Sequence, residues 1–205
     1  MKLLWSSRSP FVRKVMIAAH ETGLADQITC ERTVVAPTKP NAEVMRLNPL
    51  NKLPTLILDD GRALYDSRVI VEYLDSLNQG PKLIPAAGPA RFEALRRQAL
   101  CDGILDFLLL GLSERARPEA QQSPELKAAL SIKFKTAFDQ LEAEAAALDR
   151  QRFGLGEIAV AAATGYADFR YGSERWREGR PQLAAFASAI ADRPSIVATT
   201  HVDAY

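Results

Sequence analysis

The sequence lacks several features that would mark a function on their own, and each absence narrows the possibilities. Of its 205 residues, only 2 are cysteine and 2 are histidine. Cys30 and Cys101 lie far apart without metal-ligand spacing, and His20 and His201 have no metal-binding neighbour at helical spacing. We therefore expect both cysteines to be reduced, buried, small hydrophobic side chains, and we expect no metal site.

The chain also lacks a strong charge of either sign and any long hydrophobic run. Its 26 basic residues nearly balance 25 acidic residues, which gives a formal net charge of +1. Nucleic-acid binding would need a clustered basic excess, so no nucleic-acid partner is expected. No apolar run reaches the roughly 18 residues of a membrane span, and the N-terminus has no signal-peptide pattern. These absences predict a cytoplasmic protein without a membrane partner.

Hydrophobic periodicity divides the chain into a mixed first part and a helical second part. Residues 1–6 and 27–35 predict strands on either side of a helix over 11–23, which together make a parallel βαβ unit. The first part should then continue with a short helix over 40–47, strands over 54–58 and 62–65 around the turn Asp59-Asp60-Gly61, and a helix that opens at Asp66 and Ser67.

Residues 79–89 form the best candidate for a domain boundary. This stretch has three prolines and two glycines and shows no sustained period. Helices are expected beyond it over 90–115, 124–150, 157–171 and 181–192. The predicted organisation is an α/β domain over 1–78, a linker over 79–89 and an all-α domain over 90–205.

Two short motifs of the first part allow both a structural and a functional interpretation. Pro54 in NKLPTL fits a strand start or a cis turn, and the backbone of Leu53 could also pair with an extended, peptide-like ligand. Asp66 and Ser67 make a good helix N-cap, but the same helix end favours a carboxylate or phosphate. The Asp66 carboxylate could also bind an ammonium, so the pair could hold both charges of a zwitterion.

Together with the turn before Pro10, these motifs resemble the cytosolic glutathione S-transferases. The residues that carry the resemblance occur in family order: Ser9-Pro10-Phe11-Val12-Arg13, Asn48-Pro49, Lys52-Leu53-Pro54 and Asp66-Ser67-Arg68. More closely, SPFVRK, DGILD, RPEAQQS and GYADFR resemble the bacterial YibF-like subgroup over essentially the whole chain. The resemblance implies a thioredoxin-like N-terminal domain, an all-α C-terminal domain, a glutathione site between them, a homodimer and a role in detoxification.

The resemblance also implies which residues bind glutathione as co-substrate. Pro54 would be a cis-proline, Leu53 would pair with the cysteinyl unit, and Asp66 and Ser67 would hold the γ-glutamyl end. The remaining members of the implied set are Lys52 and Lys39 near the glycyl carboxylate, and Asp102, which would reach the γ-glutamyl amine from the partner subunit.

The serine-rich turn is the candidate for activating the glutathione thiol. A thiol with a pKa of about 8.5 is only slightly ionised at neutral pH, and a hydroxyl that donates a hydrogen bond to sulfur favours the thiolate. Ser9 is the first candidate because it directly precedes Pro10, and Ser7 and Ser6 are the alternatives. The turn has no cysteine, and Trp5 stands where a tyrosine-type enzyme needs its phenol. Ser7 and Ser9 could instead act only as helix caps.

The predicted activity is conjugation of glutathione to a small hydrophobic electrophile. Glutathione-dependent peroxidase or dehalogenase chemistry, or a non-catalytic binding module, are the alternatives. The candidates for the electrophile site are Arg8, Phe11, Phe107, Leu110 and Arg117. Gly154 and Glu157 resemble the family's N-capping box, with glycine in place of the usual serine or threonine.

Overall fold

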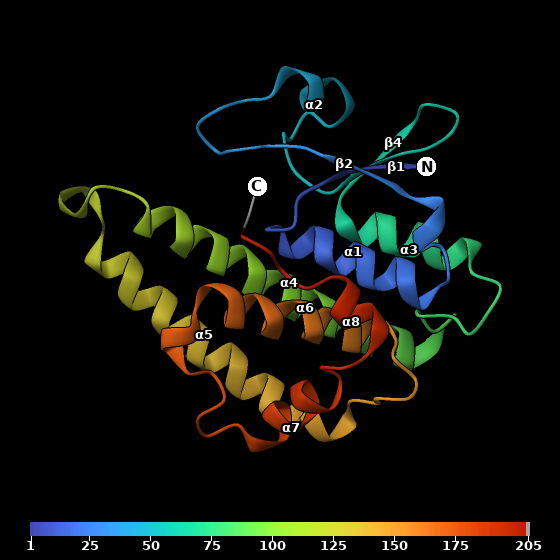
Figure 1. Ribbon diagram of the computed structural model, residues 1–205. Helices are drawn as coiled ribbons and strands as arrows, with labels where there is room; N and C mark the ends of the chain where they lie inside the picture. The colour runs from blue at the N-terminus through green and yellow to red at the C-terminus, as the bar shows by residue number, and fades with distance from the viewer. Residues whose placement is uncertain (204–205) are drawn as a thin grey trace. The chain divides into compact units, whose positions relative to one another are not determined.

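Figure 1 shows the computed structural model of the chain, which describes residues 1–203. The chain folds into two compact units. The mixed unit contains Met1–Ala86 and the segment from Arg193 onward, and the helical unit contains Ala87–Asp192. None of the helices within residues 1–203 is long and apolar enough to cross a membrane.

The mixed unit is built on a four-stranded sheet in the order β2-β1-β3-β4. Its strands are β1 (Lys2–Trp5), β2 (Thr29–Arg32), β3 (Thr55–Ile57) and β4 (Ala63–Leu64). β1 and β2 are parallel and are joined through a helix, which confirms the predicted βαβ unit. β3 is antiparallel to both of its neighbours.

The register of the strands brings three chain connections to one edge of the sheet. Leu4 near the end of β1 pairs with Thr55 at the start of β3. Leu56 in β3 pairs with Leu64 at the end of β4. The connection after β1, the connection before β3 and the connection after β4 therefore meet the sheet side by side.

Helices cover the sheet, and local sequence explains where they start and stop. They are α1 (Pro10–Glu21), the short η1 (Ala25–Gln27), α2 (Ala42–Leu47) and α3 (Ser67–Leu77). α1 begins with a proline, whose missing N–H costs nothing because the first helical position has no acceptor within the helix. It ends before Gly23, whose φ of 70° suits glycine. α1 and α3 contact each other and lie on the same side of the sheet (Figure 1).

The helical unit is organised around one buried helix. Its elements are α4 (Gly88–Arg115), η2 (Glu119–Gln121), α5 (Pro124–Glu144), η3 (Ala145–Ala147), α6 (Leu155–Arg170), η4 (Gly172–Glu174) and α7 (Pro181–Ala189). α6 is buried along nearly its whole length because its alanines allow close packing against α4. Glycine at its N-cap leaves half of the capping box, in which the Gly154 N–H donates to Glu157 at 3.2 Å.

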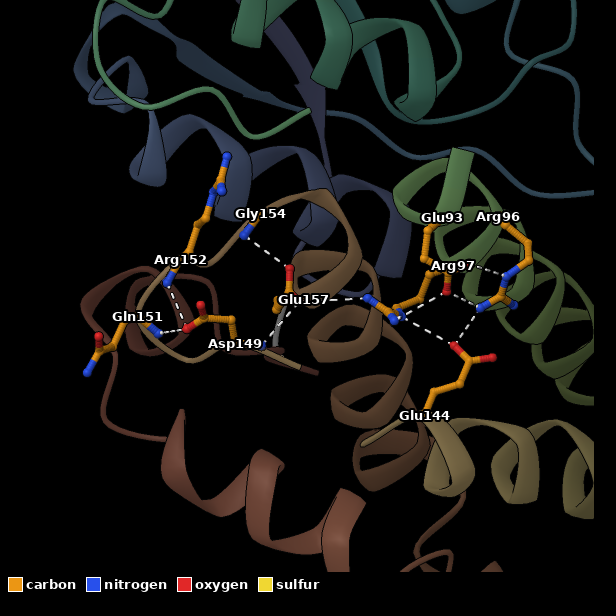
Figure 2. Close-up of polar contacts among 9 residues, drawn as sticks. All are labelled: Glu93, Arg96, Arg97, Glu144, Asp149, Gln151, Arg152, Gly154 and Glu157. Atoms are coloured by element: carbon orange, nitrogen blue, oxygen red, sulfur yellow. Dashed lines mark hydrogen bonds and ion pairs between the residues drawn. The ribbon is translucent and has the colours of Figure 1, made fainter. Parts of the chain in front are cut away.

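A buried arginine ties three helices of this unit together, as Figure 2 shows. The Arg97 side chain on α4 donates from Nε to Glu144 on α5 at 3.3 Å and from Nη2 to Glu93 at 3.4 Å. Its Nη1 lies 3.8 Å from Glu157. A Cβ added at Gly156 would meet Arg97 Nη1 at 2.9 Å, so glycine makes room for the guanidinium.

The last described segment belongs with the mixed unit, whereas the sequence analysis placed residues 90–205 together. Its helix α8 (Pro194–Ala198) was not predicted, and it packs on α1. Arg193 donates to both Glu21 carboxylate oxygens at 2.6 Å, and Ser195 also donates to Glu21. These charge-assisted bonds fasten the segment to α1.

One expectation about the cysteines is wrong. Cys101 is fully buried in α4, as predicted, but Cys30 is exposed. Cys30 lies on β2, and all four residues of that strand are exposed because the strand forms an edge of the sheet. The alternation of apolar residues in the sequence predicted a strand here. It could not show that the strand would have a neighbour on one side only.

Candidate active site

Three of the sequence motifs meet at one edge of the sheet in the mixed unit. The serine turn, defined here as residues 6–9, follows β1, and the pair Leu53-Pro54 precedes β3. Asp66 and Ser67 follow β4 and open α3. The pairing of the strands therefore gathers a hydroxyl-rich turn, an extended backbone segment and a helix N-terminus in one place.

The hydroxyls of the serine turn have different partners. The Ser9 Oγ caps α1 by accepting from the Val12 N–H at 3.2 Å. The Ser6 Oγ accepts from the Arg8 N–H at 3.3 Å, within the turn. The Ser7 Oγ donates to the carbonyl of Val202 at 2.8 Å. Because a carbonyl can only accept, the single Ser7 proton is committed to that bond.

The C-terminal segment, residues 201–203, makes further contacts with this turn that no sequence pattern predicted. Arg8 donates to the Asp203 carbonyl at 2.6 Å and pairs with the Asp203 carboxylate at 2.9 Å. The Nδ1 of His201 lies 2.9 Å from the Ser7 carbonyl and is therefore the donor. These contacts join residues more than 190 positions apart, so no local sequence signal could have revealed them.

The segment before Pro54 is shaped by a buried asparagine. The Leu53–Pro54 peptide bond is cis, as the resemblance implied. The Asn48 amide donates to the Lys52 carbonyl at 3.1 Å and to the Thr55 hydroxyl at 3.0 Å, and that hydroxyl donates to the same carbonyl. The half-buried Leu53 is thus presented by a loop whose two ends are fixed to each other.

The N-terminus of α3 carries both signs of charge. Asp66 caps the helix by accepting from the Arg68 N–H at 2.9 Å, and its second oxygen pairs with the Arg68 guanidinium at 2.9 Å. Burial by itself would raise the pKa of the Asp66 carboxyl, but bonds from Arg68 and the positive charge of Lys14 hold it below its usual range. Ser67 is buried at the first helical position. The site therefore offers an ionised carboxylate, a guanidinium and the N-terminus of a helix.

Arg68 and Lys14 are the charged groups here to which the sequence analysis gave no role. Lys14 is fully buried, and its ammonium lies 5.7 Å from the ring centre of Phe11. The burial of Lys14 could not be predicted, because lysine in an amphipathic helix is ordinarily exposed. Arg68 stood directly after the proposed anion site, and its position there was a usable signal.

The other proposed glutathione ligands stay predictions. Lys39 and Lys52 are exposed, and they flank α2 in the mixed unit. Asp102 is buried on α4 in the helical unit. Lys52 directly precedes the Leu53-Pro54 pair, whereas Lys39 lies before α2 and Asp102 belongs to the other unit.

The proposed electrophile residues are divided between the two units. Arg8 and the half-buried Phe11 belong to the mixed unit. In the helical unit, Phe107 lines a pocket of about 140 Å³ between α4 and α5, Leu110 is about half exposed, and Arg117 donates to Glu114 at 3.4 Å. Their common role stays a prediction.

The fold and this edge of the sheet define a class of protein. A parallel βαβ unit followed by a β-hairpin and a helix, with a cis-proline before the hairpin, is the thioredoxin-like arrangement. Within residues 1–203, no group of three or more His, Cys, Asp or Glu side chains could hold a metal ion.

Comparison with known proteins identifies the family within this class. Residues 8–77 match the family model for the N-terminal domain of glutathione S-transferases, and residues 124–188 match the model for the C-terminal domain. The chain is 34% identical over 201 residues to the GST-like protein YibF of Escherichia coli K12, covering 97% of this chain and 98% of that protein. The chain belongs to the glutathione S-transferase family.

Solved structures agree with this assignment. A glutathione transferase family member from Pseudomonas fluorescens Pf-5, crystallised with bound glutathione, has a TM-score of 0.93 at 40% identity, with 98% of each chain covered. A glutathione S-transferase from Methylobacillus flagellatus, also crystallised with glutathione, has a TM-score of 0.87 at 35% identity over 98% of this chain and 99% of that one. The predicted fold class, a thioredoxin-like domain with an all-α domain, is confirmed.

Proposed function

We propose that this protein is a glutathione transferase in which the Ser9 hydroxyl stabilises the thiolate of bound glutathione. The observation that carries the proposal is the geometry of Ser9. Its oxygen accepts from the Val12 N–H, so its own proton can point away from the helix toward a ligand. The sulfur would lie near the first N–H groups of α1, where the helix dipole also favours an anion.

The ends of the tripeptide would be held by charges already present at the sheet edge. The Asp66 carboxylate would bind the γ-glutamyl ammonium, and the Ser67 hydroxyl with the first N–H groups of α3 would bind the α-carboxylate. The Leu53 backbone would pair with the cysteinyl unit. Lys52 and Lys39 would approach the glycyl carboxylate, and Asp102 would act from the partner subunit of a cytoplasmic homodimer.

The chemical step would be nucleophilic attack by the thiolate. The thiol proton leaves to solvent when the hydroxyl stabilises the anion. The sulfur then forms a bond to an electrophilic carbon, and the leaving group departs with its electron pair or, in an addition, the product takes up a proton. A lowering of the thiol pKa by one to two units, about 1.4 to 2.7 kcal/mol, gives enough thiolate without removing its nucleophilicity.

The second substrate would be a small hydrophobic electrophile. Arg8 lies within the serine turn and Phe11 follows it, and Phe107, Leu110 and Arg117 would supply apolar and cationic surface on the helical unit. The same thiolate could instead reduce a peroxide or displace a halide. A panel of aromatic halides, epoxides and peroxides separates these reactions from a protein that only binds glutathione.

Replacement of Ser9 tests the proposal. In Ser9→Ala, we expect kcat with an aromatic halide to fall at least about tenfold, since the donor to the sulfur is lost. Glutathione affinity should change little because the charged ends of the ligand keep their partners. Steady-state kinetics and calorimetry measure the two effects.

Ser6→Ala and Ser7→Ala are the matched controls and should retain most activity. The proposal is wrong if Ser9→Ala keeps full activity while either control loses it. Glutathione binding without turnover of any panel member would leave a binding protein and not a transferase.

A further inference from the structure

The C-terminal segment holds the serine turn through a set of directional bonds. Ser7 and Arg8 contribute four contacts to residues 201–203, with distances from 2.6 to 2.9 Å. Two of them end on backbone carbonyls of the C-terminal segment. Half of the contacts therefore depend on the backbone path of that segment, and the other half depend on its His201 and Asp203 side chains.

The path of the C-terminal segment is fixed at the N-terminal end of α8, before the segment reaches the serine turn. Glu21 on α1 receives both nitrogens of the Arg193 fork and the Ser195 hydroxyl. The Glu21 side chain is only 13% exposed, so this attachment is largely shielded from water. α8 then leads to residues 201–203, which contact the serine turn.

The bond to Ser7 removes one of the three candidate hydroxyls. The Ser7 proton points to the Val202 carbonyl and cannot at the same time be donated to a sulfur. The oxygens of Ser6 and Ser9 accept from backbone N–H groups, which leaves their protons available. All three serines line one pocket together with Thr199 and Thr200, so Ser7 has space to rotate if its acceptor is removed.

We propose that residues 201–203 are positioning residues of the thiol site, which withdraw Ser7 from donation to the ligand's sulfur and leave that role to the other serines of the turn, of which Ser9 is the proposed donor. They act through the serine turn and do not touch the ligand. The inference rests on the proposed function, in which a serine hydroxyl stabilises glutathione thiolate. It adds that a segment remote in sequence excludes Ser7 from this role.

The test is the effect of Ser7→Ala on the pKa of bound glutathione in two forms of the protein. One is the full chain and the other is a chain that ends at Thr200. The pKa is read from the ultraviolet absorbance of the thiolate as pH is varied at saturating glutathione. In the full chain, Ser7→Ala should leave the pKa unchanged. In the shortened chain, Ser7 can replace or supplement Ser9, so Ser7→Ala should raise the pKa by about half a unit or more.

Two further variants of the full chain keep the test sound. Val202→Ala retains the backbone carbonyl and should behave like the wild type. His201→Phe removes the bond to the Ser7 carbonyl, which holds the neighbouring Val202 against the serine turn. We expect its loss to separate the Val202 carbonyl from the Ser7 hydroxyl, so that the thiol pKa becomes sensitive to Ser7→Ala, as it does on shortening. This variant provides the answer if the shortened chain does not fold, which circular dichroism would show.

The outcomes separate this inference from the proposed function. If the full chain lowers the thiol pKa through Ser9, but Ser7→Ala is silent in both the shortened chain and His201→Phe, the inference is overturned and the proposed function stands. If glutathione binds to the full chain with an unshifted thiol pKa, the proposed function fails and this inference fails with it. A purely structural role of the segment would change the melting temperature without creating sensitivity to Ser7→Ala.

Discussion

At the scale of single residues, the packing of the helical unit depends on a glycine, Gly156, which leaves room for a neighbouring side chain. Gly156 lies against the guanidinium of Arg97. The carboxylates of Glu93, Glu144 and Glu157 hold that guanidinium in position (Figure 2). A buried charge separated from its partners is strongly destabilising. The contacts that join α4, α5 and α6 therefore require the space that Gly156 leaves for the guanidinium.

We expect Gly156→Ala to destabilise the protein by about 1–3 kcal/mol, because the new methyl group would displace the Arg97 guanidinium. Gly103→Ala is the matched control. Gly103 is an exposed position of α4 where a Cβ would meet no atom within 4 Å, so this change should be neutral or slightly stabilising. Urea denaturation measures both. An unchanged free energy of unfolding in Gly156→Ala would contradict the account.

Residues whose role is set by their immediate neighbours could be predicted from the sequence. The helix cap formed by Asp66 and the place of Pro54 before a strand followed from local chemistry, and both are confirmed. Cys30 was predicted wrongly because its exposure depends on whether β2 has a second neighbour. The partners of Ser7 could not be predicted, because they lie almost the whole chain away.

At the scale of elements, α8 is attached to α1 by one carboxylate. Burial alone would raise the pKa of Glu21, but bonds from Arg193 and Ser195 outweigh it and hold the pKa below its ordinary value of 4.5. A lowered pKa means that the folded state prefers the ionised form. The stability that it contributes is present above the unfolded pKa and is lost as pH falls through the folded pKa.

We expect Glu21→Gln to lower the free energy of unfolding by about 2 kcal/mol at neutral pH. The difference from the wild type should shrink as pH falls below the ordinary pKa of Glu21. Denaturation of both proteins at several pH values measures this. Glu178→Gln removes an exposed pair with Arg175 and should have little effect. A difference that stays constant down to strongly acidic pH would contradict the proposed attachment.

The helices likewise divide into those that local sequence signals predicted and those that depend on distant contacts. Helices with caps and a clear apolar face, such as α1 and α3, could be predicted closely because both signals are local. α5 ends at Glu144, several residues before the expected 150, and its last turn changes into η3. α8 has five residues, too few for a hydrophobic period, and it is stabilised by its contact with α1.

At the scale of the whole molecule, two units share the proposed work. The mixed unit supplies the serine turn, the cis-proline segment and the charged end of α3, and the chain returns to this unit after the helical one. The change in composition after residue 78 predicted that the first part ends there, whereas the structure places the division between Ala86 and Ala87. The return of the chain could not be predicted, because it depends on the attachment of residues 193–203 to α1 and the serine turn.

The account depends most on the claim that glutathione is ionised beside Ser9. The most direct test is a pH titration of thiolate absorbance with glutathione saturating the wild-type protein and Ser9→Ala. We predict a midpoint about one to two units below that of free glutathione in the wild type, and a return toward the free value of about 8.5 in Ser9→Ala. Equal midpoints in the two proteins at proven saturation would contradict the claim.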